Sequence, residues 1–203
     1  DSVVELRVLP RIAALMGAPV GTPLPKAALR VAANVAAGED HQTQAVVDAG
    51  VLSRLMPLLL SPDVEAVKDA CWLVSNVLAG TDAQVQAVLD SGVMPALVRL
   101  VGNTDHTVAT RQQAAWCIIN VADAAKIAQV ANLAEVGCVK SLCDLLVEPQ
   151  VLPNPMAALN ALARLCRHEE RSVEAITRVD VYKLRMLQGH PSPEVQRKAH
   201  KLL

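Results

Sequence analysis

The stretch "TDAQVQAVLDSGVMPALVRLV", residues 81–101, contains the signals that decide the fold. Thr81 and Asp82 are N-cap candidates and Gly92 is typical of a sharp helix end, so we expect a short helix between them. Pro95 fits the first turn of a second helix. Residues 105–122 then predict a longer third helix, whose expected buried stripe is Val108, Ala115, Ile118, Ile119 and Ala122.

This unit recurs along the chain. Gly50, Gly92 and Gly137 follow one another at intervals of 42 and 45 residues, and Arg7 occupies the equivalent position 43 residues before Gly50. A second series of Asn34, Asn76 and Asn120 has intervals of 42 and 44 residues. A helical period in the low forties is typical of armadillo or HEAT solenoids, and a glycine between a short first helix and a second one favours the armadillo form.

The sequence therefore predicts an all-α protein, a right-handed α-solenoid of armadillo repeats, as a single array over residues 1–203. The expected repeats are approximately 1–38, 39–80, 81–123 and 124–167, followed by a degenerate capping repeat at 168–203. Three prolines predict an irregular segment from Pro149 to Pro155, and Ser192 or Pro193 is expected to begin a terminal helix. Because the pattern is cut at both ends, the chain is interpreted as a fragment of a longer array.

Composition excludes several classes of protein. The chain has 203 residues, of which 52% are apolar, and a net charge of −1 with scattered Lys and Arg, so a nucleic-acid-binding surface is not expected. No apolar run reaches the roughly 18 residues that span a bilayer. The five cysteines include no CxxC pair and predict reduced core residues of an intracellular protein. No metal site, cofactor site or catalytic motif is indicated, so we expect no enzyme.

Two short strings indicate a binding surface. "ACWLVSN", residues 70–76, and "AAWCIIN", residues 114–120, contain both tryptophans of the chain, each four residues before an asparagine. Residues three and four apart share one face of a helix, so two ridges are expected: Asp69, Trp72 and Asn76 on one third helix, and Gln113, Trp116 and Asn120 on the next.

These ridges suit an extended basic peptide. Asparagine amides can both donate to and accept from a peptide backbone, and slots between indoles accept the stem and ammonium group of Lys. The alternative is that the tryptophans are ordinary core residues. The repeated Trp and Asn pair favours the peptide groove, because a Val/Ala/Leu core offers a buried asparagine no partners.

At these residues the sequence resembles importin-α, the armadillo adaptor that recognises nuclear localisation signals. The resemblance covers nearly the whole chain, including "KDACWLVSNVLAGTDAQVQAVLDSGVMPALVRL", "RQQAAWCIINVA" and "VGCVKSLCDLL". The order of the motifs is similar to the C-terminal half of that receptor, approximately its sixth to tenth repeats.

The resemblance implies that the minor signal-binding site lies here. Trp72 and Trp116 would be the groove indoles, and Asn34, Asn76 and Asn120 would hold the peptide backbone. Arg30 stands where the first repeat would carry tryptophan. The pocket for the most deeply held lysine would be formed by Ala36, Thr43 and Asn76, flanked by Ser75.

Departures from the family pattern affect the expected charge. Gln113 stands where the family usually has Glu, so Asp69, Glu39, Asp40 and Asp82 would have to attract the bound cations. One repeat further, Asn160 and Arg164 replace the Trp and Asn, which would end the ladder of asparagines and repel a basic ligand.

The function expected from the resemblance is that of a nuclear import adaptor fragment that shuttles between cytoplasm and nucleus. Its partners would be cargo proteins with basic localisation signals and, in the full-length protein, importin-β, an export receptor and nucleoporins; neither nucleic acid nor membrane insertion is expected. We expect this chain alone not to bind importin-β, because it contains no basic segment of the importin-β-binding kind. The alternative is a catenin-like armadillo scaffold that holds other protein partners.

Overall fold

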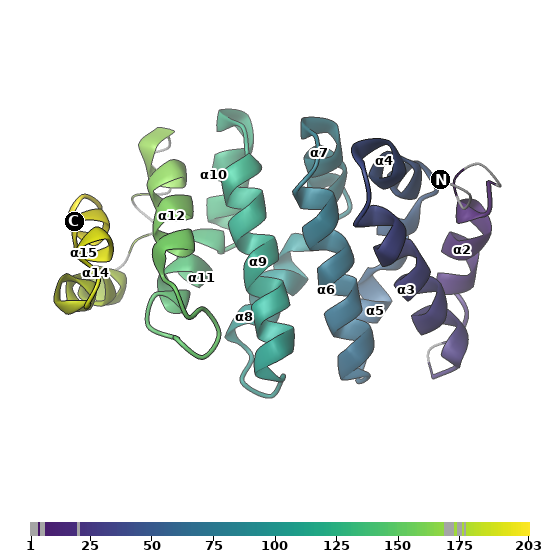
Figure 1. Ribbon diagram of the computed structural model, residues 1–203, viewed down its shortest axis with the longest axis horizontal. Helices are drawn as coiled ribbons and strands as arrows, with labels where there is room; N and C mark the ends of the chain where they lie inside the picture. Colours follow the sequence, from purple (N-terminus) through teal and green to yellow (C-terminus); the bar gives the residue numbers. More distant parts are fainter. Residues whose placement is uncertain (1–3, 5–6, 20, 169–172, 174–175, 177) are drawn as a thin grey trace. The chain divides into compact units, whose positions relative to one another are not determined.

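Helices are the regular elements of the part of the chain that the computed structural model describes, namely residues 4, 7–19, 21–168, 173, 176 and 178–203 (Figure 1). The all-α prediction is therefore confirmed. Contacts between residues divide the chain into two compact units, residues 1–97 and residues 98–203, and the boundary lies inside helix α8.

The first unit is built around two long helices that lie side by side in Figure 1, α3 and α6. Helix α2 packs on the side of α3 away from α6 (Figure 1), α4 packs against α3, α5 and α7 pack against α6, and η1 packs against α2 and α4. The elements of this unit are α2 (Leu9–Met16), α3 (Pro23–Ala36), α4 (Asp40–Asp48), the 3-10 helix η1 (Val51–Arg54), α5 (Met56–Leu59), α6 (Val64–Leu78) and α7 (Asp82–Asp90).

The second unit repeats this arrangement. The long helices α9 and α12 pack against each other, α11 packs against both, and α15 packs against α12. After α8 (Met94–Gly102), which crosses the boundary, the elements are α9 (Val108–Ala124), α10 (Ile127–Glu135), α11 (Cys138–Leu145), α12 (Met156–His168), α14 (Arg178–Met186), the 3-10 helix η2 (Leu187–Gly189) and α15 (Pro193–His200).

The predicted sharp turns after the short first helices are confirmed. Gly50, Gly92 and Gly137 have φ angles of 76°, 73° and 93°, in the left-handed region that glycine adopts without steric cost. Arg7, at the equivalent position of the first repeat, also has a positive φ of 52°. The glycine interval in the sequence thus reflects one backbone conformation that returns in each repeat.

The core is aliphatic, as the composition indicates. In the predicted stripe of α9, Ala115, Ile118, Ile119 and Ala122 are buried, but the prediction for Val108 is wrong, because 44% of its surface is exposed. Val108 is the first residue of α9, directly after the N-cap Thr107, and it lies before the first turn that packs on the core. Cys71, Cys117, Cys138 and Cys143 are buried free thiols, and burial raises the pKa of Cys71, Cys138 and Cys143 to about 12.

A glutamine is the third residue of three of the short helices, and its side chain caps each of them. The Oε1 atoms of Gln42, Gln84 and Gln129 accept hydrogen bonds from the backbone N–H three residues earlier, at 2.9, 2.9 and 2.8 Å. A Cβ atom at Gly38 or Gly80 would collide with the amide of Gln42 or Gln84, so these two glycines leave room for the cap. Gln84 also donates to the carbonyl of Asp40 at 2.9 Å, which links two repeats within the first unit.

The C-terminal predictions are confirmed where the structure describes them. An irregular segment separates α11 from α12, and Ser192 is the N-cap of α15, with Pro193 in its first turn. Part of the expected capping repeat, between 169 and 177, lies outside the described residues except for 173 and 176. No single described helix is long and apolar enough to span a membrane; α7 and α8 would meet that test only together, and they are bent by 81°.

Candidate functional site

The first unit presents the predicted ridge residues on the outer side of its long helices. Arg30 and Asn34 of α3 are exposed, whereas Trp72 and Asn76 of α6 are half-buried. The opposite faces of both helices are buried, with Leu29, Ala32 and Ala33 in α3 and Leu73, Val74 and Val77 in α6. Trp72 therefore does not belong to the core, because its neighbours on either side of the chain, Cys71 and Leu73, occupy the core instead.

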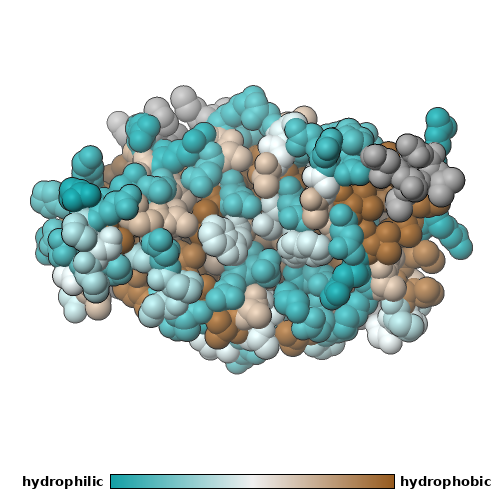
Figure 2. Space-filling model, viewed as in Figure 1, coloured by the Kyte–Doolittle hydropathy of each residue, from teal (hydrophilic) through white to brown (hydrophobic). Residues whose placement is uncertain are grey.

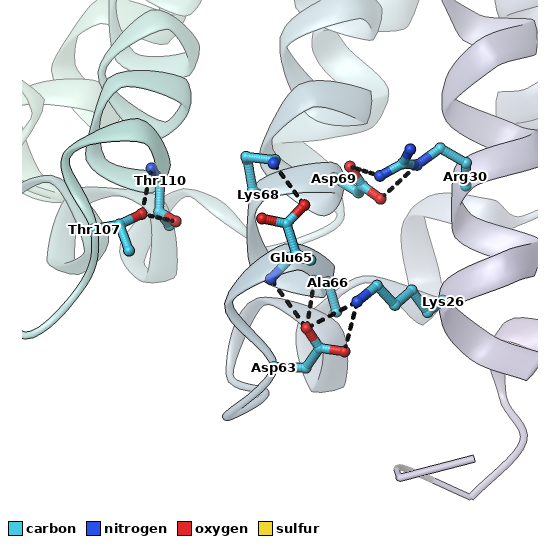
Figure 3. A network of polar contacts seen from close by, with 9 residues as sticks. All are labelled: Lys26, Arg30, Asp63, Glu65, Ala66, Lys68, Asp69, Thr107 and Thr110. Atoms are coloured by element: carbon cyan, nitrogen blue, oxygen red, sulfur yellow. Dashed lines mark hydrogen bonds and ion pairs between the residues drawn. The ribbon is translucent and has the colours of Figure 1, made fainter. Parts of the chain in front are cut away.

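Two ion pairs connect α3 to α6 (Figure 3). The guanidinium of Arg30 binds the carboxylate of Asp69 through two hydrogen bonds, Nε to Oδ2 at 2.8 Å and Nη2 to Oδ1 at 3.1 Å. One turn earlier on α3, Lys26 Nζ lies 3.0 Å from Asp63 Oδ2. Asp63 also caps α6 by accepting from the N–H groups of Glu65 and Ala66. The hydrogen bond from Lys26 holds the pKa of the Asp63 carboxyl below its usual range.

These pairs correct the expected role of Asp69. We expected its carboxylate to face bound cations, but only 6% of its side chain is exposed and its two oxygens bind Arg30. Arg30 thus supplies internally the positive charge that a ligand would otherwise supply. The other acidic residues predicted to attract cations, Glu39, Asp40 and Asp82, are exposed at the starts of α4 and α7.

The residues predicted to line a lysine pocket lie at the end of α3. Ala36 and Thr43 are buried, with 2% and 3% of their surface exposed, and the Thr43 hydroxyl donates to the Ala36 carbonyl at 3.0 Å. Asn76 Nδ2 donates to the carbonyl of Ala33 at 3.4 Å. Ser75 and Asn76 are half-buried. Of this predicted set, Ser75 and Asn76 therefore remain accessible, while Ala36 and Thr43 stabilise the last turn of α3 from within.

The second unit carries the equivalent ridge on α9. Trp116 has 43% of its surface exposed, and Gln113 and Asn120 are half-buried on the same face. On the neighbouring α12, Asn160 and Arg164 are both exposed. Burial raises the pKa of the Asp123 carboxyl near the end of α9, and the positive charge of Arg164 partly offsets this increase.

The surface seen from the side of the long helices is mixed (Figure 2). Hydrophilic residues cover most of it in both units, and hydrophobic side chains gather near α2 and α3. Exposed apolar side chains in that segment include Leu24 and Val31, with 49% and 37% of their surface exposed. Within the described residues, no group of three His, Cys, Asp or Glu side chains could hold a metal ion.

Comparison with protein families gives the class. The family model described as "Armadillo/beta-catenin-like repeat" matches residues 39–79 and 81–123. A computationally designed armadillo repeat protein for modular peptide recognition superposes with a TM-score of 0.85 at 27% identity, over 99% of this chain and 83% of that chain. A second designed armadillo protein, solved in complex with the peptide (KR)4, gives a TM-score of 0.83 at 27% identity, over 99% and 82% of the two chains. The chain therefore has the fold of an armadillo-repeat solenoid.

Curated relatives show which armadillo proteins the chain resembles in sequence. The chain is 34% identical over its whole length to importin subunit alpha-8 of Arabidopsis thaliana and 32% identical to importin subunit alpha-1b of rice, Oryza sativa subsp. japonica. Over its whole length the chain is therefore similar to part of these importin-α subunits. It spans 48% and 40% of the length of these two relatives, about half or less of each.

Proposed function

We propose that the chain is a nuclear import adaptor module that binds extended, Lys/Arg-rich localisation peptides on the ridges of α6 and α9, corresponding to the minor signal-binding site. The observation that carries this function is the position of the tryptophans. Both Trp72 and Trp116 lie on the outer face of a long helix, each with an asparagine one turn later, although the core of the chain contains almost no aromatic residues.

The chemistry of the ridges fits such a ligand. An exposed indole offers the stem of a lysine an apolar wall and its ammonium group a cation–π contact, worth about 0.5–1 kcal/mol at an exposed site. Asn76 and Asn120 can hydrogen-bond a peptide backbone, with a net gain of about 0.5–1.5 kcal/mol for each bond. These increments are small, so binding by this chain alone is expected to be modest.

Two comparisons support this function. The solved armadillo protein with the peptide (KR)4 binds a ligand of alternating Lys and Arg, and the curated relatives are importin-α subunits. By this relationship the partners are cargo proteins with basic signals, and the protein shuttles between cytoplasm and nucleus. Importin-β, an export receptor and nucleoporins would be partners of the longer protein. The role is one of binding without chemistry.

A specific observation also keeps the scaffold alternative open. Asp69 is neutralised by Arg30, Gln113 is uncharged, and Arg164 adds a positive charge next to α9. A surface with so little free negative charge could hold partners that are not basic.

The charge of the preferred ligand distinguishes the import adaptor from the scaffold. Fluorescence anisotropy of three labelled peptides would be measured with the chain: a bipartite Lys/Arg-rich peptide, the same peptide with Gln at every Lys and Arg, and an unrelated neutral amphipathic peptide. We expect saturable binding of the basic peptide and at least tenfold weaker binding of the Gln peptide, since cation–π and charge contacts are lost. Equal binding of all three, or preference for the amphipathic peptide, would favour the scaffold.

A further inference from the structure

The second unit contains a basic groove between α12 and α15, one long helix beyond the tryptophan ridge of α9. Two adjoining hollows of about 350 and about 180 Å³ share Lys198 and Lys201 of the α15 segment. The larger hollow is also lined by Ala163, Cys166, Arg167 and Leu202, and the smaller one by Met156, Asn160, Glu194 and Arg197.

Positive charge dominates this groove. Among the described residues that line it, four are cationic, Arg167, Arg197, Lys198 and Lys201, and one, Glu194, carries a carboxylate. None of the four forms an ion pair within 4 Å with any carboxylate among the residues that the structure describes. By contrast, Lys26 and Arg30 of α3 and Arg111 of α9 each form an ion pair with a carboxylate. A cluster of unpaired cations in a chain with a net charge of −1 is a local feature that attracts anionic ligands.

The dimensions of the groove fit a short extended polypeptide. It follows α12 from Met156 to Arg167, a distance of about 16 Å at the helical rise of 1.5 Å per residue. An extended chain rises about 3.3 Å per residue, so roughly five residues cover this length. Met156, Ala163, Cys166 and Leu202 provide apolar contact below the charges. No aromatic side chain lines either hollow, so the stacking contacts that hold single-stranded nucleic acid are missing there.

The groove also adjoins the surface on which a peptide is expected to lie. Asn160 lines the smaller hollow and occupies the position on α12 that Trp116 occupies on α9. Because α9 and α12 pack directly against each other, a polypeptide that leaves the α9 ridge reaches Asn160 after about 8–10 Å, or roughly three residues.

We propose that the α12–α15 groove binds an acidic polypeptide segment of about five extended residues, through its Asp and Glu side chains. This ligand is opposite in charge to the basic peptide proposed for the tryptophan ridges. Binding of an acidic segment in the groove does not depend on that basic-peptide function. The charge character of the outer face thus changes from one repeat to the next within the second unit.

The test measures binding of a labelled Asp/Glu-rich peptide by fluorescence anisotropy, beside a matched Asn/Gln peptide. Wild type is compared with the charge reversal Lys198→Glu/Lys201→Glu and with a control of equal charge change, Arg11→Glu/Arg99→Glu, whose exposed side chains lie on α2 and α8. We expect wild type and the control to prefer the acidic peptide, and the reversal at 198 and 201 to weaken its binding by about tenfold or more, with a loss of affinity as salt is raised.

Two results would overturn the proposed binding of an acidic peptide in this groove. One is equal affinity for the acidic and the neutral peptide, and the other is equal weakening of acidic-peptide binding by both charge-reversal variants. Tighter binding of a single-stranded RNA than of the acidic peptide at the same lysines would also overturn it, because the groove would then be a general polyanion site. The variant Trp72→Ala/Trp116→Ala is expected to keep its affinity for the acidic peptide, so this test is independent of the basic-peptide function. If circular dichroism shows that the charge reversal is unfolded, Lys198→Gln/Lys201→Gln replaces it, with a smaller loss expected in the same direction.

Discussion

Arg30 and Asp69 form a two-bond ion pair across α3 and α6, and Arg30 stands at the position that tryptophan occupies in the next two repeats. The hydrogen bonds to Asp69 raise the pKa of the Arg30 guanidinium. The carboxylate that precedes Trp72 by one turn is therefore occupied by a side chain of the protein. Arg30 ends the series of indoles at one side, as Asn160 ends it at the other side in the second unit.

Removal of Arg30 is expected to strengthen binding of a basic peptide. The substitution Arg30→Ala frees the carboxylate of Asp69 next to Trp72, so a ligand cation can take the place of the guanidinium. We expect the affinity for a Lys-rich peptide, measured by fluorescence anisotropy, to increase about threefold, in the range typical of partly exposed ion pairs. In Arg30→Ala/Asp69→Asn this gain should disappear. A folded Arg30→Ala variant with unchanged or lower affinity would show that Asp69 does not face the ligand.

A buried ion-pair network in the second unit predicts a strong effect on stability. Lys183 Nζ lies 2.5 Å from Asp144 Oδ1 and 2.9 Å from Asp180 Oδ1, and only 2% of the Asp180 side chain is exposed. The substitution Lys183→Met would remove a cation that binds this buried carboxylate, so we expect the free energy of unfolding to fall by about 3 kcal/mol. The matched control is Lys140→Met, since Lys140 also pairs with Asp144 but has 65% of its side chain exposed. Urea unfolding should show a change of less than about 1 kcal/mol for this control.

The same network gives a pH dependence. Burial alone would lower the pKa of Lys183, but the hydrogen bonds and charges of Asp144 and Asp180 raise it overall. A raised pKa in the folded state contributes stability that is fully present below the unfolded pKa of about 10.4 and is lost as pH rises through the folded pKa. The stability difference between wild type and Lys183→Met should therefore be constant from neutral pH to about pH 9 and shrink above pH 10. A stability difference between wild type and Lys183→Met that grew with increasing pH would contradict a raised pKa of Lys183 in the folded state.

The capping glutamine of α7 provides a second stability test. Gln84 has 1% of its surface exposed and bonds both the Thr81 N–H and the Asp40 carbonyl. Gln84→Leu leaves these two backbone groups without their partner, so we expect a loss of about 1–3 kcal/mol in urea unfolding. Gln86→Leu on the same helix changes an exposed side chain and should stay within about 0.5 kcal/mol of wild type. Equal losses in the two variants would contradict the role of the cap.

Periodic features of the sequence predicted most of the fold. The interval between Gly50, Gly92 and Gly137 marks a single left-handed turn that each repeat needs, and Thr81 begins α7 as its chemistry indicates. The interval between the asparagines likewise predicted that Trp72 and Trp116 lie on the outer face. The residues next to each tryptophan in the chain are the apolar ones that must be buried. These features depend on residues that are close together in the chain, so they can be predicted from a single sequence.

Contacts between repeats could not be predicted in the same way. Asp69 follows the helical period of the ridge, but its partner Arg30 lies 39 residues earlier and only packing brings the two together. The burial of Thr43 and Ala36 depends on how α4 covers the end of α3. The glutamines at 42, 84 and 129 did carry a signal, since they repeat at the same intervals of 42 and 45 residues as the glycines. The α12–α15 groove combines side chains from helices about 40 residues apart in the sequence, and only packing brings Arg167 to the three cations within residues 197–201.

The most direct test of the proposed function is the affinity of a labelled bipartite basic peptide for wild type and for Trp72→Ala/Trp116→Ala, measured by fluorescence anisotropy. A control variant, Leu60→Ala/Val147→Ala, removes two other exposed apolar side chains outside the ridges. We expect saturable binding by wild type and by the control, and at least about tenfold weaker binding by the tryptophan variant, since two indole contacts are lost. Equal binding by all three proteins, or no binding by the wild type, would contradict a basic-peptide site on the α6 and α9 ridges.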